Sequence, residues 1–184
     1  MKRERIIELF PAFGQIRDDG LREKTVSAMA MGIEQGGWDE DTLWKCPVTL
    51  NWQDCDVSWI AHVNDVTEMC ILQYEQVRGY YERHGVPFCR DIMVAGALLH
   101  DIGKLTEFCL EDGCVAHRPG HELMRHPLAG ALIAARAGLP DEVIHLIATH
   151  SFEGDRSFQT PESELVRAVD MLAFQCSVKG LQRC

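Results

Sequence analysis

The stretch from Val94 to Lys104 joins an apolar run to residues that can do chemistry. The run leads into an adjacent pair, His100 and Asp101, and a glycine follows shortly after the aspartate. Because neighbouring side chains on a helix point about 100° apart, the pair cannot share the centre of one buried face. At a helix end beside a glycine, however, the two side chains can converge on one point. Lys104 follows His100 by four residues and faces the same way if the helix continues that far.

Two interpretations of this stretch are open. It is either the polar tip of a core helix, with a solvated His-Asp pair and Gly103 as the C-cap, or part of a metal or catalytic site. A His-Asp pair alone is common by chance, so the remainder of the chain has to decide between them.

Further ligand-type side chains occur where apolar helical patterns turn inward. They are His62, His126, His150 and Asp170. His62 precedes Val66 by four residues and Asp170 follows Val166 by four, so each shares a helical face with an apolar neighbour. His126 comes directly before a proline, which places its ring in the first turn of a helix. Taken singly, each histidine also fits a hydrogen-bonded core residue, and Asp170 could pair with an arginine.

Together with the His-Asp pair, these side chains bring six ligand-type groups into one small helical domain. A buried carboxylate is costly unless a positive or hydrogen-bonding group meets it. Separate partners for all six groups are hard to arrange, whereas a shared cation satisfies them at once. The sequence therefore predicts a metal site.

The ordered set of histidines and aspartates resembles the HD superfamily of metal-dependent phosphohydrolases. His100-Asp101-Ile102-Gly103 matches that family's frequent His-Asp-Ile-Gly signature. Supporting matches are Ala61-His62-Val63 and His126-Pro127-Leu128-Ala129-Gly130-Ala131. The resemblance extends over about residues 60 to 175, most of the chain, and the ordered set is more specific than any single piece.

The resemblance implies a dinuclear metal centre. The residues that match the four ligands shared across the superfamily are His62, His100, Asp101 and Asp170. His126 and His150 match the two extra histidines of its dinuclear branch, in which Asp101 would bridge the metals. Mixed nitrogen and oxygen ligands suit Fe, Mn, Co, Ni or Zn rather than Ca. We therefore expect two divalent transition-metal ions as cofactors.

Basic side chains complete the implied site. The family places a basic group where Lys104 stands, so Lys104 is expected to orient the substrate. A local positive cluster consists of His117, Arg118, His121 and Arg125, and it either grips a phosphate or forms a solvated loop. His121 is the candidate general acid for the leaving group. The expected catalytic residues are Asp101, Lys104 and His121, and the expected substrate-binding residues are Lys104, His121, Arg118 and Arg125.

Three functions are compatible with this ligand set. The first, which we expect, is a phosphohydrolase that cleaves a small-molecule phosphomonoester or phosphodiester, nucleotides included. The second is an HD-fold diiron oxygenase of the inositol-oxygenase or phosphonate-cleaving type, and inositol oxygenase also has a lysine that matches Lys104. The third is a non-catalytic metal- or nucleotide-binding module, which the intact ligand set disfavours. The Gly-Tyr-Pro extension of the cyclic-di-GMP branch is absent after His150.

Amphipathic helices are expected to position these side chains. Helical patterns cover about residues 20–35, 58–84, 88–101, 122–137 and 141–150, and a last helix opens at Pro161. Asp56 or Ser58 can cap the longest one. Asp112-Gly113 lies between two short β-prone segments and predicts a hairpin. The fold class is therefore all-α with a small β-hairpin, and the resemblance implies that the helices form an HD-type bundle.

The domain organisation is expected to be simple. The chain lacks internal repeats and Pro/Gly/Ser-rich linkers, which predicts a single domain over 1–184 with its core at about 58–178 and a helical extension at 1–57. The tryptophans of the irregular segment 37–57 are expected to anchor the core rather than to contact substrate.

Composition narrows the functional classes. The net charge of −10 argues against binding to a nucleic-acid polymer, which needs a basic face. The chain shows neither an apolar run of membrane-spanning length nor the apolar region of a signal peptide, so we expect a cytoplasmic protein with no membrane partner. Its eight cysteines form no C-x-x-C pair and are expected to be reduced thiols. Oligomeric state cannot be inferred from the sequence.

Overall fold

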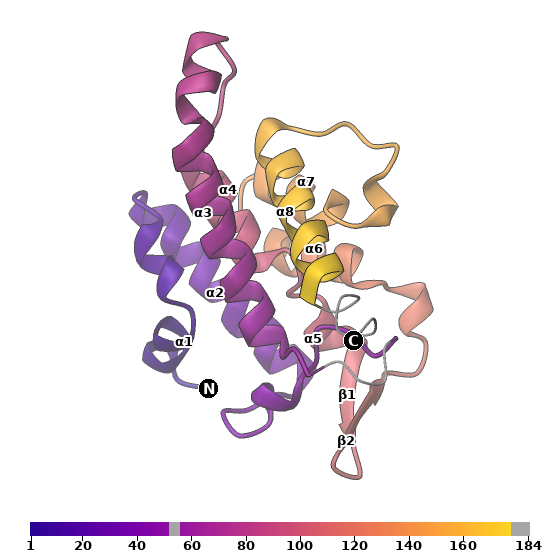
Figure 1. The fold of residues 1–184 in the computed structure, drawn as a ribbon. Coiled ribbons are helices and arrows are strands. Elements are labelled where there is room, and N and C mark those ends of the chain that lie inside the picture. Colours follow the sequence, from indigo (N-terminus) through magenta and orange to yellow (C-terminus); the bar gives the residue numbers. More distant parts are fainter. Residues whose placement is uncertain (52–55, 178–184) are drawn as a thin grey trace.

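Helices make up most of the described chain, as its apolar periodicity predicts (Figure 1). The computed structural model describes residues 1–51 and 56–177. The helices are α1 (Arg3–Leu9), α2 (Asp19–Gly36), α3 (Trp59–Arg83), α4 (Arg90–Leu99), α5 (Lys104–Glu107), α6 (His126–Arg136), α7 (Asp141–Thr149) and α8 (Pro161–Ser177). Strands β1 (Phe108–Glu111) and β2 (Cys114–His117) form an antiparallel hairpin. The predicted all-α bundle with a small β-hairpin is confirmed.

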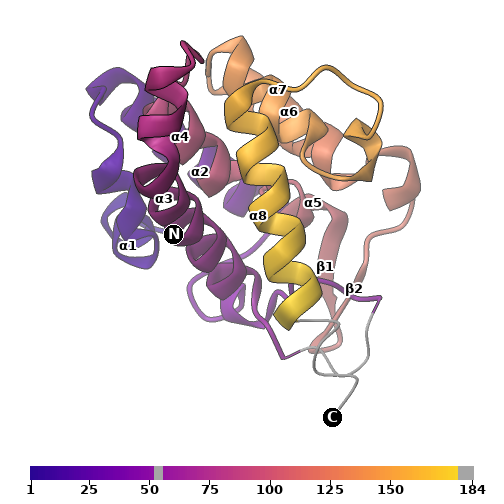
Figure 2. The same ribbon diagram turned by 45° about the horizontal axis from the view of Figure 1, so that its top comes forward.

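Helix α4 lies at the centre of the bundle. Every residue from Met93 to Leu99 is buried, and the helix packs against α2, α3, α7 and α8. Helices α3 and α8 both pack against α4, and in both ribbon views they lie side by side (Figures 1 and 2). A helix that is apolar on all sides is stable only when it is covered on all sides. Its C-terminal end therefore delivers the His100-Asp101 pair into the interior.

Helix α3 is the longest element, and its limits follow the expected signals. The Ser58 hydroxyl accepts a hydrogen bond from the Ala61 amide at 3.2 Å, which confirms one of the two predicted caps. The helix ends at Arg83, and Gly85 adopts a left-handed φ of 63° directly afterwards. Within residues 1–51 and 56–177, no helix combines the length and the apolar character needed to cross a bilayer.

Helix α6 starts later than the sequence pattern predicts. The expected start at residue 122 is wrong, because residues 121–123 form a separate 3-10 turn and α6 begins at His126. Arg125 has an extended backbone with ψ of 153°, which interrupts the helical path. Pro127 lacks an N–H group and fits the first turn, where that donor has no helical partner. His126 consequently stands at the first position of the helix.

Two buried tryptophans, Trp38 and Trp59, hydrogen-bond to the backbone that follows α4. The Trp59 indole donates to the Asp101 carbonyl at 3.0 Å, and the Trp38 indole donates to the Leu105 carbonyl at 2.7 Å. Trp38 therefore anchors the core, as predicted, whereas Trp44 is half exposed and Trp52 lies outside the described residues. These bonds fix the backbone that carries the His-Asp pair.

Candidate metal centre

The six predicted ligands converge on one point inside the bundle. They are His62 on α3, His100 and Asp101 directly after α4, His126 at the start of α6, His150 directly after α7 and Asp170 on α8. The four histidines and Asp101 are at most 7% exposed, and the Asp170 side chain is 16% exposed. Helix ends and helix faces from different parts of the chain therefore bring these six side chains together, which the sequence spacing alone could only suggest.

The ligand atoms form two groups that share a boundary at Asp101. Within each group the atoms lie within 4.8 Å of one another, and the groups are His62, His100 and Asp170, and Asp101, His126 and His150. Oδ2 of Asp101 lies 3.5 Å from Nε2 of His62 and 3.6 Å from Nε2 of His100. Oδ1 lies 3.5 Å from Nε2 of both His126 and His150. Each carboxylate oxygen thus faces one group, the arrangement expected of a bridging ligand.

Backbone carbonyls orient two of the imidazoles. Nδ1 of His100 lies 2.7 Å from the Ala97 carbonyl, and Nδ1 of His150 lies 2.8 Å from the Ile147 carbonyl. An Nδ1–H that donates to a carbonyl leaves the Nε2 lone pair free to bind a metal. Each histidine follows the last residue of its helix, so a carbonyl of the last turn is the partner in both cases.

Burial and charge set the protonation states of the centre. Burial lowers the pKa of His100 to about 4, which keeps its ring neutral. Burial opposes ionisation of Asp101, but the positive charge of Lys104 holds its pKa well below the usual range. For Asp170 burial is likewise outweighed by the hydrogen bond from His62, and the pKa falls to about 2. Ionised carboxylates and neutral imidazoles are the forms that bind metals.

The donor set fits a divalent transition metal. Oδ2 of Asp101 is buried, and although Lys104 Nζ is 2.6 Å away, no hydrogen bond of normal geometry reaches this oxygen among the described residues. Burial disfavours a charged ring at His150, yet the adjacent Asp101 raises its pKa, so a proton competes for the same nitrogen. A cation shared by these buried nitrogen and oxygen donors would give the Asp101 oxygen a partner and would take the place of the proton on His150.

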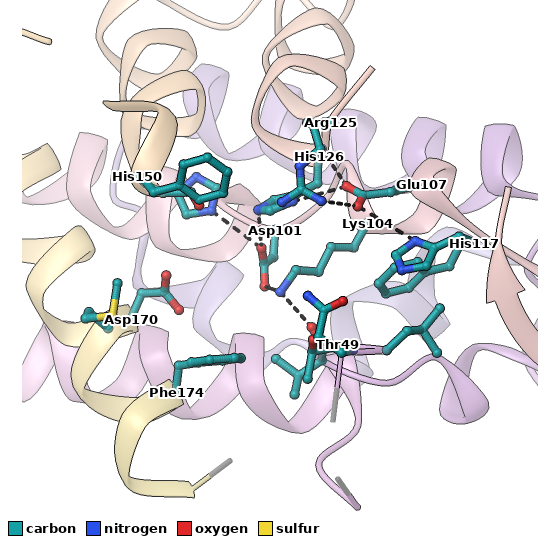
Figure 3. Close-up of a pocket in the computed structure, with 17 residues that line it drawn as sticks. Thr49, Asp101, Lys104, Glu107, His117, Arg125, His126, His150, Asp170 and Phe174 are labelled. Carbon is teal, nitrogen blue, oxygen red and sulfur yellow. Dashed lines mark hydrogen bonds and ion pairs between the residues drawn. The ribbon is translucent and has the colours of Figure 1, made fainter. Parts of the chain in front are cut away.

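A cavity of about 230 Å³ opens beside the ligands (Figure 3). Asp101, His126, His150 and Asp170 line one part of it, and Lys104 lies alongside. Nζ of Lys104 also donates to the Val48 carbonyl at 2.7 Å. The segment from Val48 to Asn51 and Phe174 of α8 complete the wall. Lys104 therefore lines the same cavity as the predicted ligands, and its role as a substrate-orienting cation stays a prediction.

The predicted positive cluster is only partly brought to this cavity. Arg118 donates to the carbonyls of Thr106 and Gly36 at 3.1 Å each, and it does not line the cavity. His121 is 3.2 Å from the Arg118 carbonyl and stacks on His117 with 4.0 Å between ring centroids. His117, and not His121, lines the cavity. The contacts of Arg118 and His121 therefore favour positions behind the wall over direct contact with substrate.

Arg125 lines the cavity but is engaged by carboxylates. Its guanidinium lies 2.6 Å from Glu107 and 3.3 Å from Glu153, and it sits 5.7 Å from the Phe152 ring centroid. Two acidic partners offset its charge, which weakens the expected direct grip on a phosphate.

Sequence reasoning missed two contributors to the site. Glu107 is 2% exposed and contacts both Arg125 and His126. Its only sequence signal is an acidic residue between the buried Leu105 and the apolar Phe108, which is weak by itself. The wall from Val48 to Asn51 carries no motif, and only the fold brings it beside Lys104.

The fold and the ligand set together define a class of protein. The family model described as HD domain matches residues 62–174, so the chain belongs to the HD domain family. HD domains bind divalent metals, and both His/Asp clusters lie within this range. No solved structure matches the chain significantly.

The chain is similar in sequence to several named proteins. The chain is 33% identical over 168 residues to dihydroneopterin 2',3'-cyclic phosphate phosphodiesterase of Methanocaldococcus jannaschii, in a match that covers 87% of this chain and 63% of that protein. It is 37% identical over 84 residues to ribonuclease Y of Roseiflexus sp., covering 45% of this chain and 13% of that protein. Ribonuclease Y of Thermotoga petrophila is 36% identical over 78 residues, with 42% and 13% covered. The matched part of the chain therefore spans less than two thirds of the length of each of these relatives.

Proposed function

We propose that this protein is a metal-dependent phosphohydrolase whose substrate is a small phosphodiester, with a 2',3'-cyclic phosphate as the first candidate. The carrying observation is that both oxygens of Asp101 face histidine nitrogens at 3.5–3.6 Å beside a cavity that contains Lys104. The name of the M. jannaschii relative supports a cyclic phosphodiester. The −10 net charge favours a small substrate over a polymer.

Two divalent ions are proposed as cofactors. His62, His100 and Asp170 would hold one ion, His126 and His150 would hold the other, and Asp101 would bridge them. When bound, such ions supply Lewis-acid chemistry, which activates a water for attack and offsets charge on the phosphoryl oxygens. Fe, Mn, Co, Ni and Zn all suit this donor set.

Lys104 is proposed to bind the phosphoryl group. Its ammonium has three N–H donors; one points to the Val48 carbonyl, and its charge faces the Asp101 carboxylate at 2.6 Å. A remaining donor is available to a phosphoryl oxygen, where the positive charge stabilises the charge that develops as the ester bond breaks. The role of His121 as general acid stays an untested prediction, and because His117 and not His121 lines the cavity we leave it out of the proposed mechanism.

The decisive experiment measures metal content and then hydrolysis. Protein purified without chelator or nickel affinity is expected to contain two metal equivalents per chain by elemental analysis. It is expected to hydrolyse bis(p-nitrophenyl) phosphate and 2',3'-cyclic nucleotides in a chelator-sensitive reaction. No metal after reconstitution would overturn the proposal, as would oxygen consumption without phosphate-ester cleavage, which would indicate the oxygenase alternative.

Two variants at the C-terminal part of α7 link metal to activity. His150→Ala, directly after the helix, removes a proposed ligand and is expected to lower metal content toward one equivalent and kcat by about 10²-fold or more. His145→Ala, within the helix, removes a ring whose Nε2 lies 2.9 Å from the Phe158 carbonyl outside the cavity. This control is expected to retain both metals and normal turnover. Equal turnover in the two variants would argue against a dinuclear site.

A further inference from the structure

We propose that Glu107 is a positioning residue that orients His126 toward the metal centre and couples this ligand to the cavity wall. The inference rests on the proposed metal-dependent function and adds a residue to it. Glu107 is the last residue of α5, and its side chain is 2% exposed. Figure 3 shows its carboxylate between His126 and His117.

One oxygen of Glu107 faces the proposed ligand. Oε2 accepts a hydrogen bond from the His126 amide at 2.7 Å and lies 3.2 Å from Nδ1 of the same residue. A carboxylate only accepts hydrogen bonds, so the nearby Nδ1 must carry the proton. With the proton on Nδ1, the lone pair of Nε2 is free to bind the metal. Nε2 lies 3.5 Å from Asp101 Oδ1.

The other oxygen faces the wall of the cavity. Oε1 lies 2.6 Å from Arg125 Nη1 and 4.0 Å from His117 Nδ1, and both of these residues line the cavity. A carboxylate this deeply buried is stable only with charge-assisted partners on both oxygens. The two oxygens of one carboxylate therefore contact a residue of the cavity wall and a proposed metal ligand.

His126 has more need of such a partner than His100 and His150 do. His150 and His100 direct Nδ1 at a carbonyl of their own preceding helix. His126 stands at the start of α6, where no preceding helical turn supplies a carbonyl. Glu107, on α5, supplies the acceptor for His126 Nδ1 instead.

A purely structural role is the rival explanation, because Glu107 also satisfies a backbone amide at a helix start. Glu162 offers a matched control for that role. It is 7% exposed, and its Oε1 accepts a hydrogen bond from the Cys89 amide at 2.5 Å, at the start of α4. Glu162 is absent from the residues that line the cavity and from the predicted ligand groups.

The test is a titration of chelator-stripped protein with Zn²⁺ alone, followed by calorimetry. The wild type is expected to bind two ions. Glu107→Ala is expected to weaken one of the two sites by about 10- to 100-fold and to leave the other unchanged, since removal of a group that orients a ligand has effects of this size. Glu107→Gln keeps an acceptor oxygen and is expected to restore part of the lost affinity. Glu162→Ala is expected to bind both ions as the wild type does, although urea unfolding shows comparable destabilisation.

The outcomes separate this inference from the proposed function. Wild-type affinity at both sites in Glu107→Ala would overturn the positioning role and leave the metal centre intact. Equal weakening in Glu107→Ala and Glu162→Ala would also overturn it, because the effect would then be structural. A wild type that binds no zinc would overturn the proposed function itself. Should Glu107→Ala fail to fold, the Glu107→Gln titration decides, and unchanged affinity there counts against the inference.

Discussion

At the scale of single residues, Lys104 is expected to be both a substrate contact and a counter-charge for a buried carboxylate. Its Nζ lies 2.6 Å from Asp101 Oδ2, and the two side chains are 12% and 2% exposed. Lys104→Met leaves that carboxylate without its cation, which is expected to destabilise the chelated protein by about 3 kcal/mol. Urea unfolding in the presence of chelator measures this loss.

Added metal distinguishes the two roles of Lys104. Bound ions replace the missing positive charge beside Asp101, so Mn²⁺ is expected to restore most of the stability of Lys104→Met while turnover stays about 10²-fold low or lower. Lys24→Met, which removes an exposed lysine of α2, is the control and is expected to change neither quantity. Full activity of metal-loaded Lys104→Met would contradict the role in substrate binding.

The same scale shows why some site residues can be predicted from the sequence and others cannot. Imidazole and carboxylate groups on apolar helical faces need partners, so His62 and Asp170 are conspicuous in the sequence alone. Arg118 and His121 lie in a turn-rich stretch where spacing does not set direction, and both are turned away from the cavity in the fold. Glu107 has no partner within helical reach along the chain, because its partners come from the region around α6.

At the scale of elements, the helices follow from periodicity, but the contacts between them do not. The C-cap interpretation of Gly103 is wrong, since its φ is −66° and not left-handed. The residue is glycine because α5 and α6 approach closely. A Cβ there would overlap the His126 carbonyl and lie 2.7 Å from the Gly130 amide nitrogen.

This close approach makes Gly103→Ala a test of element packing. The added methyl meets backbone, which cannot move aside cheaply, so we expect a loss of roughly 3 kcal/mol in the free energy of unfolding. Displacement of α6 would also shift His126 and reduce metal content. Gly14→Ala is the control, because a Cβ at Gly14 meets nothing within 4 Å. Equal stability of the two variants in urea would show that α5 and α6 are not locked together.

At the scale of the whole molecule, the proposed metal centre makes the free energy of unfolding depend on pH and on bound metal. Burial lowers the pKa of His100 from 6.5 to about 4 in the folded state, so the folded protein binds this proton less readily than the unfolded chain. Stability from His100 is therefore complete above pH 6.5 and is lost as the pH falls toward 4. His126 acts in the same direction, while the raised pKa of His150 acts in the opposite one. Asp170, with a pKa of about 2 against 3.8, loses its contribution only below about pH 4.

We therefore expect chelated protein to lose about 3 kcal/mol of stability between pH 7 and pH 4 from His100 alone, at about 1.36 kcal/mol per pKa unit. Metal-loaded protein should have a higher free energy of unfolding at pH 7 than chelated protein, because ions that bind only the folded chain stabilise it. Protons and metals compete for the same Nε2 atoms, so the advantage of the loaded form should vanish over this pH range as metal is released. Urea unfolding at half-unit pH steps, with metal release followed by elemental analysis, measures both curves. His100→Gln removes the titrating ring and should flatten the slope of the chelated protein. A slope that survives this substitution would place the acid sensitivity elsewhere in the bundle.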